Sequence, residues 1–196
     1  ALREGYDLVL LDVRATDRDG DPVDGVQIAD LLVRDRDAYR RHFAGADAVV
    51  HFGFISAGLR DTDAGFQAEL SNVQMAYNVY QTSLEAGVRR VVVASSNHAA
   101  DYYEPLILDG RWDVVDPNGR ALSDNYYGWA KESYEHLGFV FAAGRLGVRR
   151  PLENVQIRIG GPRETDVSRC EPGDLRCVRR ALAAYISQRD LQQLFV

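Results

Sequence analysis

Apolar and polar positions along the chain form blocks that predict strands and helices in turn. Short apolar runs predict strands over residues 6–12, 26–30, 47–52, 90–95 and 155–159. The runs at 6–12 and 90–95 are apolar almost throughout, as is typical of parallel strands covered on both faces. Such strands require helices packed above and below the sheet.

The helical pattern is clearest over residues 66–86. Apolar side chains recur there at steps of three or four, and Gly87 supplies a stop signal. Similar reasoning predicts a helix end before Gly5, further helices over 37–44, 124–143 and 175–185, and an irregular excursion over 99–122. Ser187 to Asp190 forms a capping box that opens a last helix.

Strand and helix alternate from one end to the other, and no segment repeats. This alternation predicts an α/β fold with a doubly wound parallel sheet. Ligands of such sheets bind beyond the carboxyl ends of the strands. The positions to inspect are therefore Asp12, Asp30, 53–56, 95–98 and 160–162.

Composition and charge narrow the functional classes. The chain has 196 residues, of which 46% are hydrophobic and 27% charged, with a net charge of -6. An acidic chain is a poor nucleic-acid binder, because neutralising phosphates needs a basic face. No apolar run approaches the roughly 20 residues that cross a bilayer, and no secretory signal pattern is present. We expect a cytoplasmic protein that binds a small molecule.

The two cysteines, Cys170 and Cys177, lie in a segment rich in Pro, Gly and Arg. They could pair, but we favour two free thiols, as is usual in the cytoplasm. Too few His and Cys residues lie nearby for a zinc site, so no metal is expected.

Tyr127 and Lys131 are the first candidate catalytic residues. Four residues make just over one helical turn, so both side chains leave the same face of the predicted helix. A phenol has a pKa near 10, and a nearby ammonium favours the phenolate that can act as a base. Tyr126 is at the wrong spacing for this role. The ordinary alternative is a half-buried tyrosine beside a solvated lysine.

A polar segment follows the most apolar strand. Ser95, Ser96, Asn97 and His98 lie where an α/β sheet presents side chains to its ligand. A serine hydroxyl at this place can hydrogen-bond the substrate oxygen whose proton Tyr127 removes. The alternatives are turn capping for the serines and a surface or helix-start position for His98.

These residues together resemble the extended short-chain dehydrogenase/reductase family, the NAD-dependent epimerases and dehydratases with a Rossmann-like fold. Residues 51–56, 95–98 and 158–160 look most like the uronate dehydrogenases. The resemblance implies NAD-dependent oxidation of a hexuronate to an aldarolactone. It also implies a homodimer or higher homo-oligomer, built through the helices at 66–86 and 124–143. Tyr80, Tyr134 and Phe141 fit such an interface or the core equally well.

The resemblance assigns roles by position. Tyr127 is the general base, Lys131 holds the nicotinamide ribose, and Ser96 orients the substrate hydroxyl. Asp12, at a strand end, would accept hydrogen bonds from the adenosine ribose and favour NAD over NADP. Further cofactor contacts are implied at Asp30, Leu31, Phe52, Gly53, Asn72 and Ile159, and substrate contacts at Ser56, Asn97, His98 and Arg180.

The substrate carboxylate needs a partner, and a guanidinium is suited to a planar carboxylate. Arg180 matches the region whose arginine has this role in the uronate dehydrogenases. Arg163, Arg176 and Arg179 compete with it. A solvated arginine is the plain alternative.

The sequence departs from the family at both ends. The family opens with a strand and a glycine-rich turn that binds the cofactor pyrophosphate, and no such turn occurs in this sequence. We therefore expect a piece of a longer protein, with an incomplete NAD-binding domain over 1–160 and the start of a substrate-binding region over 161–196. Ala130, Gly161 and the apparent insertion at 164–175 also differ, and the last two weaken the substrate assignment.

Two alternatives remain open. A nucleotide-sugar epimerase or dehydratase would use the same fold, although Asn97 and His98 after Ser96 disfavour dehydration. A non-catalytic protein that senses a dinucleotide would often lose the tyrosine or the lysine, and this chain keeps both.

Overall fold

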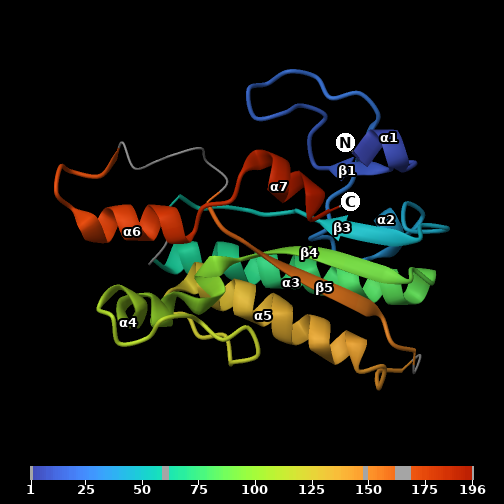
Figure 1. Ribbon diagram of the computed structural model, residues 1–196. Helices are drawn as coiled ribbons and strands as arrows, with labels where there is room; N and C mark the ends of the chain where they lie inside the picture. The colour runs from blue at the N-terminus through green and yellow to red at the C-terminus, as the bar shows by residue number, and fades with distance from the viewer. Residues whose placement is uncertain (1, 59–61, 148–149, 162–168, 196) are drawn as a thin grey trace.

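The computed structural model describes residues 2–58, 62–147, 150–161 and 169–195. Figure 1 shows strands and helices in alternation, which confirms the predicted α/β class. In chain order the elements are α1 (Leu2–Gly5), β1 (Leu10–Asp12), β2 (Val26–Ile28), α2 (Asp37–Arg40), β3 (Ala48–His51), α3 (Asp63–Ala86), β4 (Arg90–Ser96), η1 (Asn97–Tyr103), α4 (Glu104–Leu108), α5 (Tyr126–Ala142), β5 (Glu153–Ile159), α6 (Leu175–Ala183) and α7 (Gln188–Gln193).

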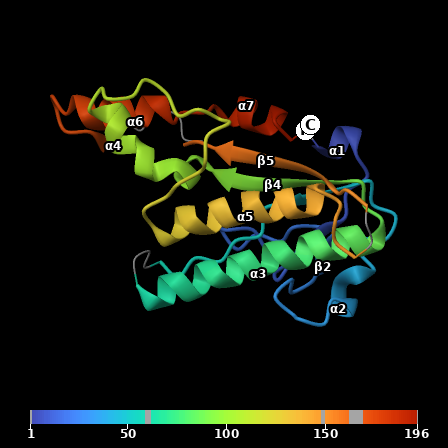
Figure 2. The same ribbon diagram turned by 90° about the horizontal axis from the view of Figure 1, so that it is seen from below.

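The strands of the described residues pair in parallel, as predicted, and form two sheets. β1 pairs with β2, and β4 lies between β3 and β5. The long helices α3 and α5 lie side by side on one face of the sheet of β3, β4 and β5, and α7 lies on the opposite side (Figure 2). Helix α6 lies beyond the ends of the strands, against α4. This is the helix–sheet–helix layering of a doubly wound fold.

The prediction that residues 6–12 form a strand buried on both faces is wrong. Only residues 10–12 form β1, and the side chains of Tyr6 and Val9 are 50% and 60% exposed. The reason is pairing: β2 is the only described strand that pairs with β1, so β1 and β3 belong to separate sheets. In the standard doubly wound strand order 3-2-1-4-5-6, the position between the β1–β2 sheet and the β3–β4–β5 sheet belongs to the strand that leads into the glycine-rich turn.

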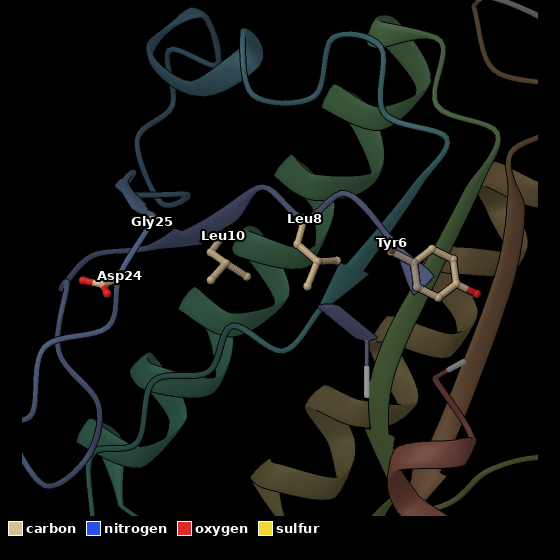
Figure 3. Close-up of a pocket in the computed structure, with 5 residues that line it drawn as sticks. All are labelled: Tyr6, Leu8, Leu10, Asp24 and Gly25. Carbon is tan, nitrogen blue, oxygen red and sulfur yellow. The ribbon is translucent and has the colours of Figure 1, made fainter. Parts of the chain in front are cut away.

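A shallow pocket of about 310 Å³ lies beside β1 and the start of β2 (Figure 3). Tyr6, Leu8 and Leu10 alternate along one side of the extended chain, and Asp24 and Gly25 complete the lining. The lining contains none of the predicted site residues, so the catalytic groups must be sought elsewhere.

The core lies between the two long helices and the sheet of β3, β4 and β5. Tyr80 stacks on Phe141 with ring centroids 5.2 Å apart, and both side chains are fully buried, as is Tyr134. These three aromatic residues are therefore core residues in this structure. Gly87 ends α3 in a left-handed conformation, with φ of 83°, as its place in the sequence predicted.

The segment over 99–122 is more regular than predicted. Ser96 opens the 3-10 helix η1, its Oγ accepting from the backbone N–H of His98 at 3.2 Å, and α4 follows directly. Pro105 lies in the first turn of α4, where its missing N–H costs nothing. The rings of Tyr103 and Trp112 then stack at 5.1 Å and fold the remaining loop back.

The preference for free thiols is also wrong. Cys170 and Cys177 form a disulfide, with their Cα atoms 5.6 Å apart. Gly173 turns the intervening chain with a φ of 89°, which brings the two ends together. The cysteines therefore give no support to the expected cytoplasmic location, which stays a prediction.

Among the described residues, no helix is both long and apolar enough to cross a membrane. The same residues contain no group of His, Cys, Asp and Glu side chains arranged to hold a metal ion.

Candidate active site

The polar end of the sheet is built by β4 and β5. Ser96 pairs in register with Ile159, so the two predicted site residues lie side by side at the carboxyl ends of adjacent strands. Ser95 and Ser96 are nearly buried. The Oγ of Ser95 donates to Glu135 of α5 at 2.8 Å, which ties the strand end to the helix that carries the candidate catalytic pair.

Helix α5 begins where its capping residue predicts. The side chain of Asn125 accepts a hydrogen bond from the backbone N–H of Gly128 at 2.9 Å. Tyr127 follows in the first turn, half-buried, with its ring against those of His98 and Phe54 at centroid distances of 5.4 and 5.6 Å. The helix start therefore holds the phenol between the end of β4 and the loop after β3.

Lys131 lies one turn further along α5 and is buried. Its Nζ donates to the backbone carbonyl of Ala94 in β4 at 2.9 Å. The same nitrogen is 5.6 Å from the ring centroid of Tyr127, 5.2 Å from that of Phe54 and 4.7 Å from that of Tyr134. The structure thus places the predicted pair on one helix face, with the ammonium held beneath the phenol.

The surroundings of Lys131 disfavour charge. Burial lowers the pKa of Lys131 to about 8, and the negative charge of Glu69 on α3 opposes this change. Burial also lowers the pKa of His51 to about 4, with the charge of Lys131 acting in the same direction. Burial raises the pKa of Tyr134. Lys131 is therefore the buried group of this cluster that changes its charge near neutral pH.

This pKa gives a testable pH dependence of stability. The unfolded chain keeps the lysine charged up to about 10.5, whereas the folded protein releases the proton near 8. Between these values the unfolded state binds more protons, so the free energy of unfolding rises with pH. We expect a rise of about 1.5 kcal/mol from pH 8 to pH 9.5 that is missing in Lys131→Met, measured by urea unfolding. Equal slopes in the two proteins would contradict a depressed pKa at Lys131.

The remaining residues after β4 form a tight turn. The Oγ of Ser96 accepts the bond from the His98 backbone and lies 3.5 Å from the Asn97 side-chain oxygen. Ser96 therefore does cap the turn, the alternative considered above, while it also lies at the predicted end of the sheet. The His98 ring contacts Tyr127, as described, so His98 is part of this site and not of a remote surface.

The predicted adenosine contacts lie at the ends of β1 and β2. Asp12 is exposed, and one of its carboxylate oxygens accepts from the backbone N–H of Arg14 at 3.0 Å. Asp30 does the same for Leu32 at 2.9 Å. The carbonyl of Leu31 accepts from Asn78 of α3 at 2.7 Å, which fixes the loop after β2 to the long helix.

Loop residues after β3 approach the helix closely. A Cβ on Gly53 would lie 2.7 Å from the sulfur of Met75, so a larger residue there would require the Met75 side chain to shift. Phe52 is half-exposed and packs on Phe195 at 4.6 Å. Asn72 is buried, and its side-chain amide exchanges hydrogen bonds with both backbone groups of Ile55 at 2.7 and 2.8 Å. Asn72 thus supports this loop.

The arginines and Ser56 lie in more exposed positions. Arg180 on α6 forms an ion pair with Glu104 at 3.0 Å, and Arg176 forms one with Asp109 at 3.0 Å. Ser56 accepts from the backbone N–H of Gly58 at 3.2 Å. Arg163 and residues 164–168 of the apparent insertion lie outside the described residues.

The comparisons with known proteins agree with this geometry. A family model described as "NAD dependent epimerase/dehydratase family" matches residues 1–138. The chain belongs to this family. A uronate dehydrogenase of Pseudomonas syringae pv. tomato is 32% identical over 170 residues, which cover 86% of this chain and 52% of that protein.

Two further similar proteins extend the comparison. An L-arabinose 1-dehydrogenase (NAD(P)(+)) of Haloferax volcanii is 31% identical over 198 residues, covering 94% of this chain and 74% of that protein. A solved glucuronic acid dehydrogenase from Chromohalobacter salexigens matches the fold with a TM-score of 0.64 at 24% identity, covering 95% of this chain and 59% of that one. The chain spans about half the length of the uronate dehydrogenase it matches.

The family name implies NAD, and the described residues fit both ends of a dinucleotide. The exposed carboxylate of Asp12 ends β1, where a ribose hydroxyl can donate to it. At the other end, the Lys131 ammonium has three hydrogens, of which the Ala94 carbonyl takes one. The glycine-rich turn that would hold the pyrophosphate is not part of this sequence.

Sequence reasoning missed several charged residues that organise the site. Arg158 of β5 makes two bonds to Glu135 of α5, at 2.7 and 2.6 Å, beside Ser95. Asp101 binds His98, and Asn125 binds Asp101. The spacing of three between His98 and Asp101 was the only available signal, and it becomes meaningful only once that segment is known to be helical.

Proposed function

We propose that this protein is an NAD-dependent dehydrogenase that oxidises a sugar acid, a hexuronate, at its anomeric carbon and forms an aldarolactone. The observation that carries the proposal is the buried Lys131, held by the Ala94 carbonyl directly beneath Tyr127. Uronate dehydrogenases among the relatives support the substrate class.

In the proposed reaction Tyr127 is the general base. Its phenolate oxygen takes the proton of the anomeric hydroxyl while the carbon–hydrogen bond at the same carbon breaks and a carbonyl forms. NAD, when bound, supplies the acceptor for the hydride. The positive charge of Lys131 favours the phenolate, and its ammonium hydrogens bind the nicotinamide ribose. Ser96 donates to the substrate oxygen and keeps it beside Tyr127.

The remaining contacts follow from position. Asp12, Asp30 and Leu31 lie at the carboxyl ends of β1 and β2 and would contact the adenosine. We propose further cofactor contacts from residues along the loop and strand ends near Tyr127, namely Phe52, Gly53, Asn72 and Ile159. The carboxyl ends of parallel strands meet at one edge, which supports a cofactor lying across all of them.

Substrate contacts are proposed for Ser56, Asn97, His98 and Arg180. The Arg180 guanidinium suits a carboxylate, yet it is paired with Glu104 at 3.0 Å. A substrate carboxylate must therefore displace Glu104 or share Arg180 with it. The protein is also proposed to be cytoplasmic and, by its resemblance to the family, to form a homodimer or higher homo-oligomer.

The test follows NAD reduction by absorbance with glucuronate, galacturonate, L-arabinose and glucose. Reduction with the uronates and little with the neutral sugars is the expected result, because only the uronates carry the carboxylate. Turnover of L-arabinose alone would replace the sugar acid with a neutral aldose. Absence of reduction by any free sugar, with tight binding of a nucleotide sugar, would favour an epimerase or dehydratase. NAD binding without any turnover would favour a dinucleotide sensor.

A further inference from the structure

A chain of hydrogen bonds connects His98 to the start of helix α5. Nδ1 of His98 lies 2.7 Å from Oδ2 of Asp101 and 3.0 Å from Oδ1. The amide of Asn125 donates to the same Oδ2 at 2.8 Å, and its oxygen accepts from the Gly128 backbone N–H at 2.9 Å. We call His98, Asp101 and Asn125 the histidine clamp.

The clamp leaves little freedom to the imidazole. The Asp101 side chain is 13% exposed, and that of His98 is 28% exposed. The His98 backbone is fixed as well, since its N–H donates to Ser96 and a Cβ on Gly128 would collide with its carbonyl oxygen. Asn125 has both ends of its amide engaged, so it cannot turn away from Asp101 without losing the helix cap.

A carboxylate only accepts hydrogen bonds, so the ring nitrogen facing Asp101 carries a proton. In the neutral imidazole the other nitrogen, Nε2, is then an acceptor. The ring centroids of His98 and Tyr127 lie 5.4 Å apart, so the imidazole borders the candidate catalytic tyrosine. A solvated imidazole favours the opposite tautomer, with the proton on Nε2, so Asp101 has to select this state.

We propose that Asp101 is a positioning residue that fixes His98 in the Nδ1–H form, so that Nε2 accepts a hydrogen bond from a substrate hydroxyl next to the one that is oxidised. Asn125 holds the Asp101 carboxylate and links its place to the helix turn that carries Tyr127. The assignment of the His98 tautomer depends only on the geometry of the histidine clamp. The hydrogen bond that Nε2 accepts from the substrate rests on the proposed dehydrogenase activity.

The first test reads the tautomer directly, without substrate or cofactor. At pH 8.5, above the ordinary histidine pKa, the ring ¹⁵N shifts of His98 distinguish a protonated Nδ1 from a protonated Nε2. The signals are assigned by their loss in His98→Gln. We expect Nδ1–H in the natural protein and mainly Nε2–H in Asp101→Ala.

A matched control is Asp124→Ala. Asp124 is an exposed carboxylate that also accepts from the Asn125 amide, at 3.2 Å, and makes no bond to His98. Its removal is expected to leave the tautomer unchanged. A natural protein with Nε2–H would overturn the proposal even if Asp101→Ala failed to fold. So would a folded Asp101→Ala that keeps Nδ1–H.

The second test uses kinetics on an active sugar. Asp101→Ala is expected to raise the KM for the sugar about tenfold, because one oriented hydrogen bond is lost, and to leave the KM for NAD unchanged. His98→Gln combined with Asp101→Ala should be no worse than His98→Gln alone, because Asp101 acts through His98. Additive effects of the two substitutions would overturn this role. A protein that shows the predicted tautomer but oxidises no sugar would refute the proposed function and leave the clamp intact.

Discussion

Replacing Tyr127 with phenylalanine is expected to lower turnover about 10²–10⁴-fold, the range typical of a lost general base. Phenylalanine keeps the ring that packs against His98 and Phe54 at 5.4 and 5.6 Å, so the local packing survives. Only the oxygen that accepts the substrate proton is removed. We therefore expect kcat to fall while the affinity for NAD, measured by quenching of protein fluorescence, changes little.

The neighbouring residue provides the control. Tyr126 precedes Tyr127 on the same helix, is 41% exposed and packs on Phe66 at 5.3 Å. Tyr126→Phe removes a hydroxyl at nearly the same place and is expected to keep full turnover. If Tyr127→Phe were as active as Tyr126→Phe, the proton would have to go to another group and the proposed mechanism would be wrong.

The second large effect is expected on stability. Arg158→Met removes both hydrogen bonds from β5 to Glu135 and leaves that carboxylate, 17% exposed, bound by the neutral Ser95 hydroxyl. Removing one partner of a mostly buried ion pair leaves an unpaired charge. The free-energy cost of that charge exceeds the stability that the intact pair contributes. We expect the free energy of unfolding to fall by about 2–3 kcal/mol, measured by urea denaturation.

A surface pair of the same chemistry tests this reasoning. Arg89 binds Glu153 at 2.9 Å, but its side chain is 58% exposed, so Arg89→Met should change stability little. Adding Glu135→Leu to Arg158→Met is expected to recover most of the loss, because no charge is left unpaired. A loss from Arg89→Met as large as that from Arg158→Met would show that burial does not decide the effect.

The Arg158–Glu135 pair also bears on the site. Glu135 lies one helical turn after Lys131 on α5, and Ser95 precedes Ser96 on β4. The pair therefore fixes the catalytic helix to the ends of two strands. Through this connection the pair is expected to keep Tyr127 and Ser96 in register.

Much of the architecture could be predicted from local patterns. The apolar run that became β4, the three-and-four spacing of α3 and the stop at Gly87 each depend on neighbours within about one turn or one strand. The same holds for Tyr127 and Lys131, since a spacing of four on a helix decides that they share a face. Such features need no knowledge of the rest of the chain.

Only the tertiary structure decided the features that depend on distant partners. The exposure of residues 6–9 follows from which strands pair with β1, and the Cys170–Cys177 disulfide follows from how the chain turns between them. The histidine clamp joins segments 24 residues apart, from Asp101 to Asn125. The sequence shows which kinds of partner an apolar run or a charged residue can contact. Its burial, its pKa and its hydrogen-bond partners depend on the segments that folding places next to it.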